Sequence, residues 1–80
     1  MREQALEEVP IRDGSIRLVQ LLKLANLVES GSDVRLLLAD GLVTVNGEAE
    51  SRRGRQLRDG DVVALGGVSV RVRRAPPATP

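Results

Sequence analysis

Six basic side chains are the residues of this sequence whose types and spacing could carry chemistry. Three lie before residue 40 in stretches with helical spacing, and three lie in one short segment, 51–55, that has no apolar residue. The six are Arg17, Lys23, Arg35, Arg52, Arg53 and Arg55. Cations that line one face can contact nucleic-acid phosphates. If segment 51–55 folds beside the helices, the six would form such a face, although each taken singly is more commonly a solvated surface residue.

The net charge of +1 conceals an uneven distribution along the chain. Residues 1–50 contain five basic and nine acidic side chains, a net charge of −4, whereas residues 51–80 contain seven arginines and two aspartates, a net charge of +5. This split predicts a polyanion-facing surface built largely by the C-terminal half. The alternative is that the charges scatter over a solvated surface once the chain folds.

Three kinds of residue are missing, and their absence narrows the possible functions. The sequence has no cysteine, no histidine and no aromatic residue. The commonest metal ligands and the usual base near neutral pH are therefore missing, and the serines have no histidine to activate them. We expect no catalysis, no cofactor, no metal and no small-molecule substrate. If nucleic acid is bound, the absence of aromatic rings for base stacking means that recognition should run through phosphates, 2′-hydroxyls and shape.

The composition predicts one small globular domain. The 80 residues are 41% hydrophobic and 29% charged, which is typical of a folded chain and allows one thin core. No apolar run reaches the length of a membrane-spanning helix, and the acidic N-terminus is unlike a signal peptide. We therefore expect a cytoplasmic protein with no membrane partner.

Two helices and several short strands are predicted to position the six cations. Helical spacing of apolar residues runs over about 18–27 and again over about 32–40, where Gly41 should end the second helix. Asn46-Gly47 predicts a hairpin turn after a strand at 42–45. Later strands are expected at 62–65 and, with clear alternation, at 68–72.

The ends of the chain give three further expectations. Val9–Arg12 and Ser15–Arg17 flank Asp13-Gly14, which favours a short edge hairpin. Residues 1–10 are predicted to be a flexible N-terminal segment and residues 75–80 a disordered Pro-rich tail. The domain itself would then occupy residues 11–74.

In this order the motifs resemble the S-four RNA-binding domain, named after ribosomal small-subunit protein four. The similar pieces are Ile16 to Ala25, Glu29 to Gly31 with Arg35, Val43 to Glu48, and Arg52 to Val63. V-N-G followed by R-R-G-R-x-L-R-x-G-D makes the ordered set specific. The resemblance runs from about Ile11 to about Val72 and is strongest to short bacterial proteins that consist of this domain alone.

The resemblance implies a fold and a function. The fold is α+β, an αα hairpin packed on a small, strongly bent antiparallel sheet (the αL motif). The function is non-catalytic binding of structured or double-stranded RNA, such as ribosomal or transfer RNA, with the ribosome as a possible partner. Arg17 and Arg35 match basic positions on the two helices of the family. Arg52, Arg53 and Arg55 match the basic loop of the short proteins.

A different class of function is the alternative. Leu24, Leu27 and Leu36 lie off the main apolar faces of the predicted helices. They could form an exposed apolar patch, which would suit a small protein–protein adaptor. General DNA binding is a third possibility.

Overall fold

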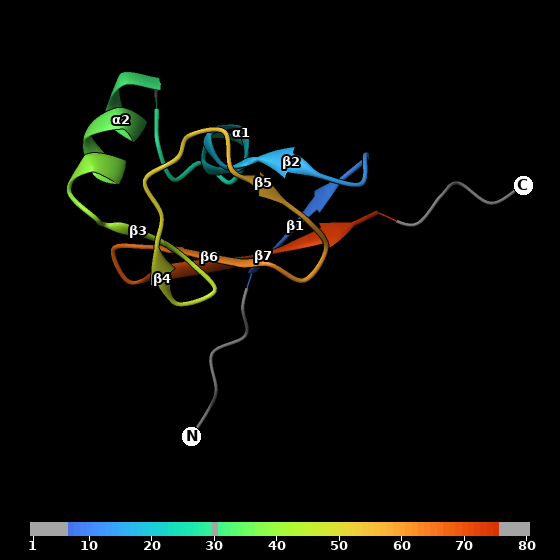
Figure 1. Cartoon of the computed structure of the whole chain (residues 1–80). Coiled ribbons are helices and arrows are strands. Elements are labelled where there is room, and N and C mark those ends of the chain that lie inside the picture. Colours follow the sequence, from blue (N-terminus) through green and yellow to red (C-terminus); the bar gives the residue numbers. More distant parts are fainter. Residues whose placement is uncertain (1–6, 30, 76–80) are drawn as a thin grey trace, which may run out of the picture.

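Valine-rich strands and two leucine-rich helices form two layers in the computed structural model, which describes residues 7–29 and 31–75 (Figure 1). In chain order the elements are β1 (Glu7–Ile11), β2 (Ile16–Arg17), α1 (Leu18–Leu24), α2 (Gly31–Ala39), β3 (Val43–Val45), β4 (Glu48–Ala49), β5 (Gln56–Leu57), β6 (Val62–Leu65) and β7 (Val68–Arg74). The helices and the β2–β5 pair lie on one side of a larger sheet. The predicted α+β class is confirmed.

The larger sheet has five strands in the order β1-β7-β6-β3-β4. Three of the strand pairs are antiparallel, namely β7–β6, β6–β3 and β3–β4. Strand β1 instead runs parallel to β7, with Val9 opposite Val72. The sheet is therefore mixed, and the prediction of an antiparallel sheet was wrong at this edge. Strands β2 and β5 form a separate antiparallel pair, with Ile16 opposite Leu57.

The Asn46-Gly47 turn is confirmed and joins β3 to β4. Both residues have positive φ, 53° and 89°, as a type I′ turn requires. The Asn46 side chain also reaches across the sheet, because its amide oxygen accepts the Val62 N–H at 3.0 Å and its amide nitrogen donates to Asp61 Oδ1 at 3.1 Å. One residue thus sets the turn and ties it to the start of β6.

Both helices end through the same left-handed backbone step. Gly41 has φ 72°, and Leu42 donates its N–H to the Leu37 oxygen at 3.0 Å, so α2 ends as predicted. Asn26 has φ 63°, and the following residue bonds back to Leu22 in the same way at 2.9 Å. Helix α1 therefore stops at Leu24, earlier than its apolar spacing suggested, because asparagine tolerates this conformation.

The predicted edge hairpin around Asp13-Gly14 does not form. Strand β1 pairs with β7 and β2 pairs with β5, so the chain crosses from one sheet to the other between them. Val9 and Ile11 are buried by the pairing with β7, which removes more apolar surface from water than a two-stranded hairpin would. Pro10, which lacks an N–H, fits the edge position of β1.

The structure assigns part of the predicted N-terminal segment to the sheet. Residues 7–10 belong to β1, and residues 1–6 lie outside the described residues. At the other end, Ala75 donates its N–H to the Ile11 oxygen at 2.8 Å, which extends the pairing of β1 with β7. Residues 76–80 of the predicted tail also lie outside the described residues.

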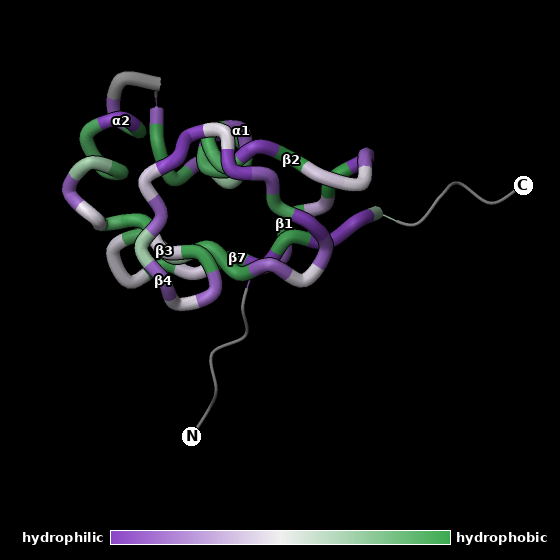
Figure 2. The backbone as a smooth tube through the Cα atoms, viewed as in Figure 1, coloured by the Kyte–Doolittle hydropathy of each residue, from purple (hydrophilic) through white to green (hydrophobic). Residues whose placement is uncertain are grey.

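The hydrophobic core lies between the two layers. Helix α1 contributes three leucines, α2 and the linker before it contribute three residues, and the strands contribute the rest, mostly valines (Figure 2). The buried apolar residues are Val9, Ile11, Leu18, Leu21, Leu22, Val28, Val34, Leu38, Val43, Val45, Leu57, Val63, Val70 and Val72. Neither described helix has the length and apolar character needed to cross a membrane.

Candidate nucleic-acid interface

The basic segment between β4 and β5 is fastened to the first turn of α1. Leu18 donates its N–H to the Arg55 oxygen at 2.8 Å, and Val19 donates to the Arg53 oxygen at 3.1 Å. The first N–H groups of a helix have no partner within the helix, so these carbonyls satisfy two of them. Arg17 lies directly before α1 and pairs with Gln56. The fold thus brings segment 51–55 to Arg17, although 34 or more residues of chain separate them.

A buried carboxylate organises the basic segment. Glu50 accepts four hydrogen bonds: the backbone N–H and Nε of Arg52 donate to Oε2 at 3.0 and 3.1 Å, and Arg52 Nη2 and Arg55 Nη1 donate to Oε1 at 3.2 and 2.8 Å. The Glu50 side chain is only 9% exposed, and its own N–H is bonded to the Val43 oxygen at 3.0 Å. The backbone of Glu50 is therefore anchored to β3, and its carboxylate is paired with both arginines.

The two arginines determine how Glu50 ionises. Hydrogen bonds from Arg52 first, and then from Arg55, lower the pKa of Glu50 from 4.5 to about 2, against the opposing effect of burial. The same contact raises the pKa of Arg52. At neutral pH the three groups therefore hold two positive charges and one negative charge, a cluster with a net charge of +1.

Acid should weaken the folded protein through Glu50. Because the folded-state pKa is about 2 and the unfolded value 4.5, Glu50 stabilises the fold above pH 4.5, and this contribution is lost as the pH falls toward 2. We expect a loss of about 2 kcal/mol, since water screens the pair through the exposed Arg52. Urea unfolding at a series of pH values measures it. In Glu50→Gln the fall over this range should be shallower, and an equal fall in both proteins would contradict this role.

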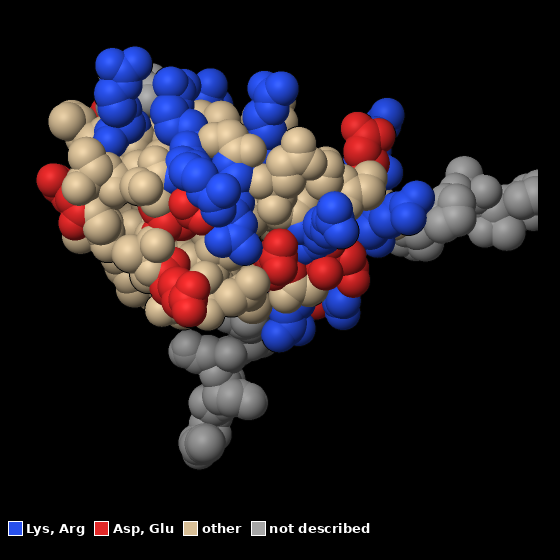
Figure 3. All heavy atoms as spheres, viewed as in Figure 1, with Lys and Arg blue, Asp and Glu red and all other residues tan. Residues whose placement is uncertain are grey.

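The other four basic residues are exposed and lie on β2, on the two helices and in the loop. Lys23 lies in the last turn of α1, about 9 Å along the axis from Arg17. Arg35 lies on the solvent side of α2, next to the fully buried Val34. Within residues 7–29 and 31–75, no carboxylate forms an ion pair with Arg17, Lys23, Arg35 or Arg53. Figure 3 shows Lys and Arg side chains gathered over α2, the top of α1 and the loop between β4 and β5.

Arg73 of β7, in contrast, has a structural role. Its Nε donates to Glu8 Oε2 at 3.2 Å, and its Nη1 lies 3.7 Å from Asp59 Oδ2. These contacts tie β7 to the neighbouring strand and to the turn before β6. The positive charge of β7 is thus partly neutralised by its neighbours, unlike that of α2 and the loop.

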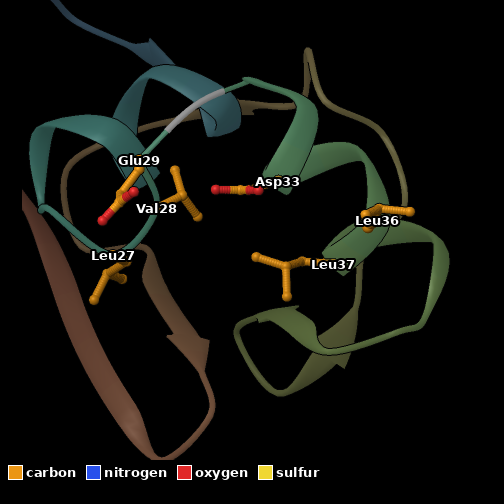
Figure 4. Close-up of a pocket in the computed structure, with 6 residues that line it drawn as sticks. All are labelled: Leu27, Val28, Glu29, Asp33, Leu36 and Leu37. Carbon is orange, nitrogen blue, oxygen red and sulfur yellow. The ribbon is translucent and has the colours of Figure 1, made fainter.

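The three leucines of the adaptor alternative do not form one patch. Leu27 and Leu36 line a hollow of about 290 Å³ between α2 and the linker before it, where Asp33 and Leu37 of α2 face Val28 (Figure 4). Leu24 lines a different hollow. Leu24 and Leu36 are 57% and 65% exposed, whereas Leu27 packs against the core. The apolar surface is therefore divided.

Glu50 is a residue of the site that was not predicted from the sequence, where segment 51–55 was recognised only by its basic residues. A signal was present, because an acidic residue two positions before Arg52 and five before Arg55 can reach both guanidinium groups in a tight loop. The burial of Glu50 and the bond from its N–H to the Val43 oxygen belong to the folded structure, which local spacing does not reveal.

Comparison with known proteins agrees with this architecture. A family model described as "S4 domain" matches residues 9–73. "Probable ribosome maturation protein RlbA" of Bacillus subtilis (strain 168) is 46% identical over 52 residues, which cover 65% of this chain and 73% of that protein. "Putative RNA-binding protein YbcJ" of Escherichia coli (strain K12) is 37% identical over 57 residues, 71% of this chain and 81% of that protein.

A solved structure extends the similarity over nearly the whole chain. The solution structure of YbcJ from E. coli, reported to reveal an αL motif involved in RNA-binding, superposes with a TM-score of 0.67 and 30% sequence identity. The match covers 91% of this chain and 94% of that one. The match to the family model spans well over half of the chain, and both relatives exceed 30% identity. The chain belongs to the S4 domain family.

Proposed function

We propose that this protein is a non-catalytic, cytoplasmic RNA-binding protein that grips structured or double-stranded RNA, such as ribosomal or transfer RNA. The proposed contact surface, called the basic face below, consists of Arg17, Lys23, Arg35, Arg52, Arg53 and Arg55. The observation that carries the proposal is the pair of hydrogen bonds between segment 51–55 and the first turn of α1. These bonds bring the cations of the loop beside those of β2 and α1. The names of the relatives support the same proposal: YbcJ is named as an RNA-binding protein and RlbA as a ribosome maturation protein.

The chemistry of the basic face favours backbone and shape recognition. Arginine forks match the geometry of phosphate oxygens, and five of the six residues are arginines. With no aromatic side chain in the chain, bases cannot be read by stacking on rings. Double-stranded RNA displays phosphates and 2′-hydroxyls across a wide minor groove, which suits such a surface. Binding should therefore be salt-dependent and only loosely sequence-specific.

A competition experiment tests this proposal. Fluorescence anisotropy would measure the affinity for a hairpin RNA, a single-stranded RNA and a DNA duplex of matching sequence, over a series of salt concentrations. We expect the hairpin RNA to bind most tightly, with log affinity falling against log salt at a slope of about −3 to −5. If the DNA duplex binds as tightly as the hairpin RNA, the protein binds nucleic acids in general and is not specific for RNA. No binding of any probe at low salt would refute the proposal and direct attention to the exposed leucines.

A further inference from the structure

Glu50 holds two arginines of the basic segment that line a hollow. Next to the two arginines is a hollow of about 480 Å³, lined by Arg52, Gly54, Arg55 and Gln56. Among the described residues, Glu50 is the one buried charged side chain, and it holds both arginines. A carboxylate placed inside a polyanion-binding surface lowers the attraction for phosphate, so its presence calls for a physical reason.

The polar groups around the hollow are arranged as donors. Each guanidinium has five N–H groups, and Glu50 takes two from Arg52 and one from Arg55, so most remain for another acceptor. The Gln56 carbonyl oxygen accepts the Ser15 hydroxyl at 3.0 Å, which leaves the Gln56 amide nitrogen as a donor. The Glu50 oxygens already accept four hydrogen bonds. The hollow therefore suits a group with several acceptor oxygens.

Glu50 also limits how far the two arginines can move. The Arg52 side chain is 71% exposed, and a free arginine in that position would sample many rotamers. Its Nε and Nη2 instead form a two-point contact with the carboxylate of Glu50, a buried residue whose backbone N–H is bonded to β3. Holding a side chain in its bound geometry before the ligand arrives reduces the entropy lost on binding.

We propose that the hollow lined by Arg52, Gly54, Arg55 and Gln56 binds one backbone phosphate group of RNA, and that Glu50 is the positioning residue that presets the two arginines for it. This inference rests on the proposed function, because the phosphate is supplied by the RNA. It adds a defined phosphate site and assigns a binding role to an acidic residue.

Neutralising Glu50 tests the inference, because the inference and long-range attraction predict opposite changes in RNA affinity. Glu50→Gln makes the protein more positive by one charge, so long-range attraction alone would tighten RNA binding. If Glu50 positions the arginines, binding of the hairpin RNA should instead weaken, by about tenfold. Glu48→Gln is the matched control, since Glu48 is exposed on β4 and the same charge is removed. It should bind RNA as tightly as the unmodified protein or slightly more tightly.

Circular dichroism would show whether Glu50→Gln folds. If it does not, two arginine-to-lysine variants that keep the net charge provide the test. Arg52→Lys keeps the charge but loses the two-point contact with Glu50, so RNA binding should weaken several-fold. Arg58→Lys, at an exposed arginine outside the basic face that makes no contact with Glu50, should leave RNA binding unchanged. Equal effects of the two lysine variants would overturn the inference.

The outcomes separate this inference from the proposed function. Folded Glu50→Gln that binds the hairpin RNA as tightly as the unmodified protein, or more tightly, overturns the positioning role and leaves RNA binding intact. Failure of the unmodified protein to bind any RNA overturns both. Weaker binding in Glu50→Gln, with no loss in Glu48→Gln, supports the phosphate site.

Discussion

The double variant Arg35→Glu with Arg53→Glu is expected to bind hairpin RNA about 100-fold more weakly at moderate salt. Each change removes one cation that can contact a phosphate and adds a repelling carboxylate, worth roughly tenfold per site. The two residues lie on different elements, α2 and the loop before β5, so their effects should add. The slope of log affinity against log salt should become shallower by about 1.5. Fluorescence anisotropy across a salt series measures both quantities.

The control is a second double variant, Arg12→Glu with Arg58→Glu. Both are exposed arginines outside the basic face, one on the turn after β1 and one before the turn that leads to β6. The control pair changes the net charge by the same amount as Arg35→Glu with Arg53→Glu. We expect it to weaken binding about threefold or less through the long-range field. Equal losses in the two double variants would mean that net charge, and not the basic face, governs binding.

Leu57→Ala is expected to remove about 3 kcal/mol of folding free energy. Leu57 is fully buried, in the short strand that pairs with β2 just after the basic segment. Truncating a buried leucine loses its transfer free energy and leaves a cavity, at a cost of about 2–5 kcal/mol. A domain of this length has a total stability of only about 4–12 kcal/mol, so the loss is large. Urea unfolding followed by circular dichroism measures it.

The same truncation on the surface serves as the control. Leu36 of α2 is 65% exposed, and Leu36→Ala should change the free energy of unfolding by less than about 0.5 kcal/mol. A small effect of Leu57→Ala, comparable to that of Leu36→Ala, would show that β5 does not belong to the core. The anchoring of the basic segment to α1 would then lose its structural basis.

Local signals in the sequence predicted the elements that local physics controls. Asn46-Gly47 demands positive φ at two consecutive residues, so a type I′ hairpin follows from the residue types alone. Gly41 ends α2 for a similar reason, and the alternation of Val70 and Val72 with polar residues indicated a strand with one buried face. The α+β class was implied by the resemblance of the ordered motifs to the S-four domain.

Features that depend on contacts between distant segments were not predictable in this way. The sequence of β1 does not state that its partner is β7, some 60 residues away, or that the pairing is parallel. The end of α1 is a different case, because it is local. Asn26 adopts a positive φ and Leu27 donates its N–H to the Leu22 oxygen, although the apolar spacing continues past this point.

The candidate site also has features that the sequence predicted and features that it did not. The six basic residues were identified from their type and spacing, and whether they bind RNA together remains a prediction. The capping of α1 by the carbonyls of Arg53 and Arg55 and the burial of Glu50 could be seen only in the three-dimensional structure. Two of the six predicted cations, Arg52 and Arg55, are therefore held by the carboxylate of Glu50.

Nuclear magnetic resonance mapping tests the central claim most directly, because an 80-residue chain allows every backbone amide signal to be followed as hairpin RNA is added. We expect the largest chemical-shift changes in segment 51–55, in the first turn of α1 and on the Arg35 side of α2. The amides of β1 and β7, where Arg73 is paired with Glu8, should change little. If the largest changes fall on β1 and β7 while segment 51–55 and α2 remain unaffected, the RNA-binding surface lies elsewhere and the basic face is a solvated surface.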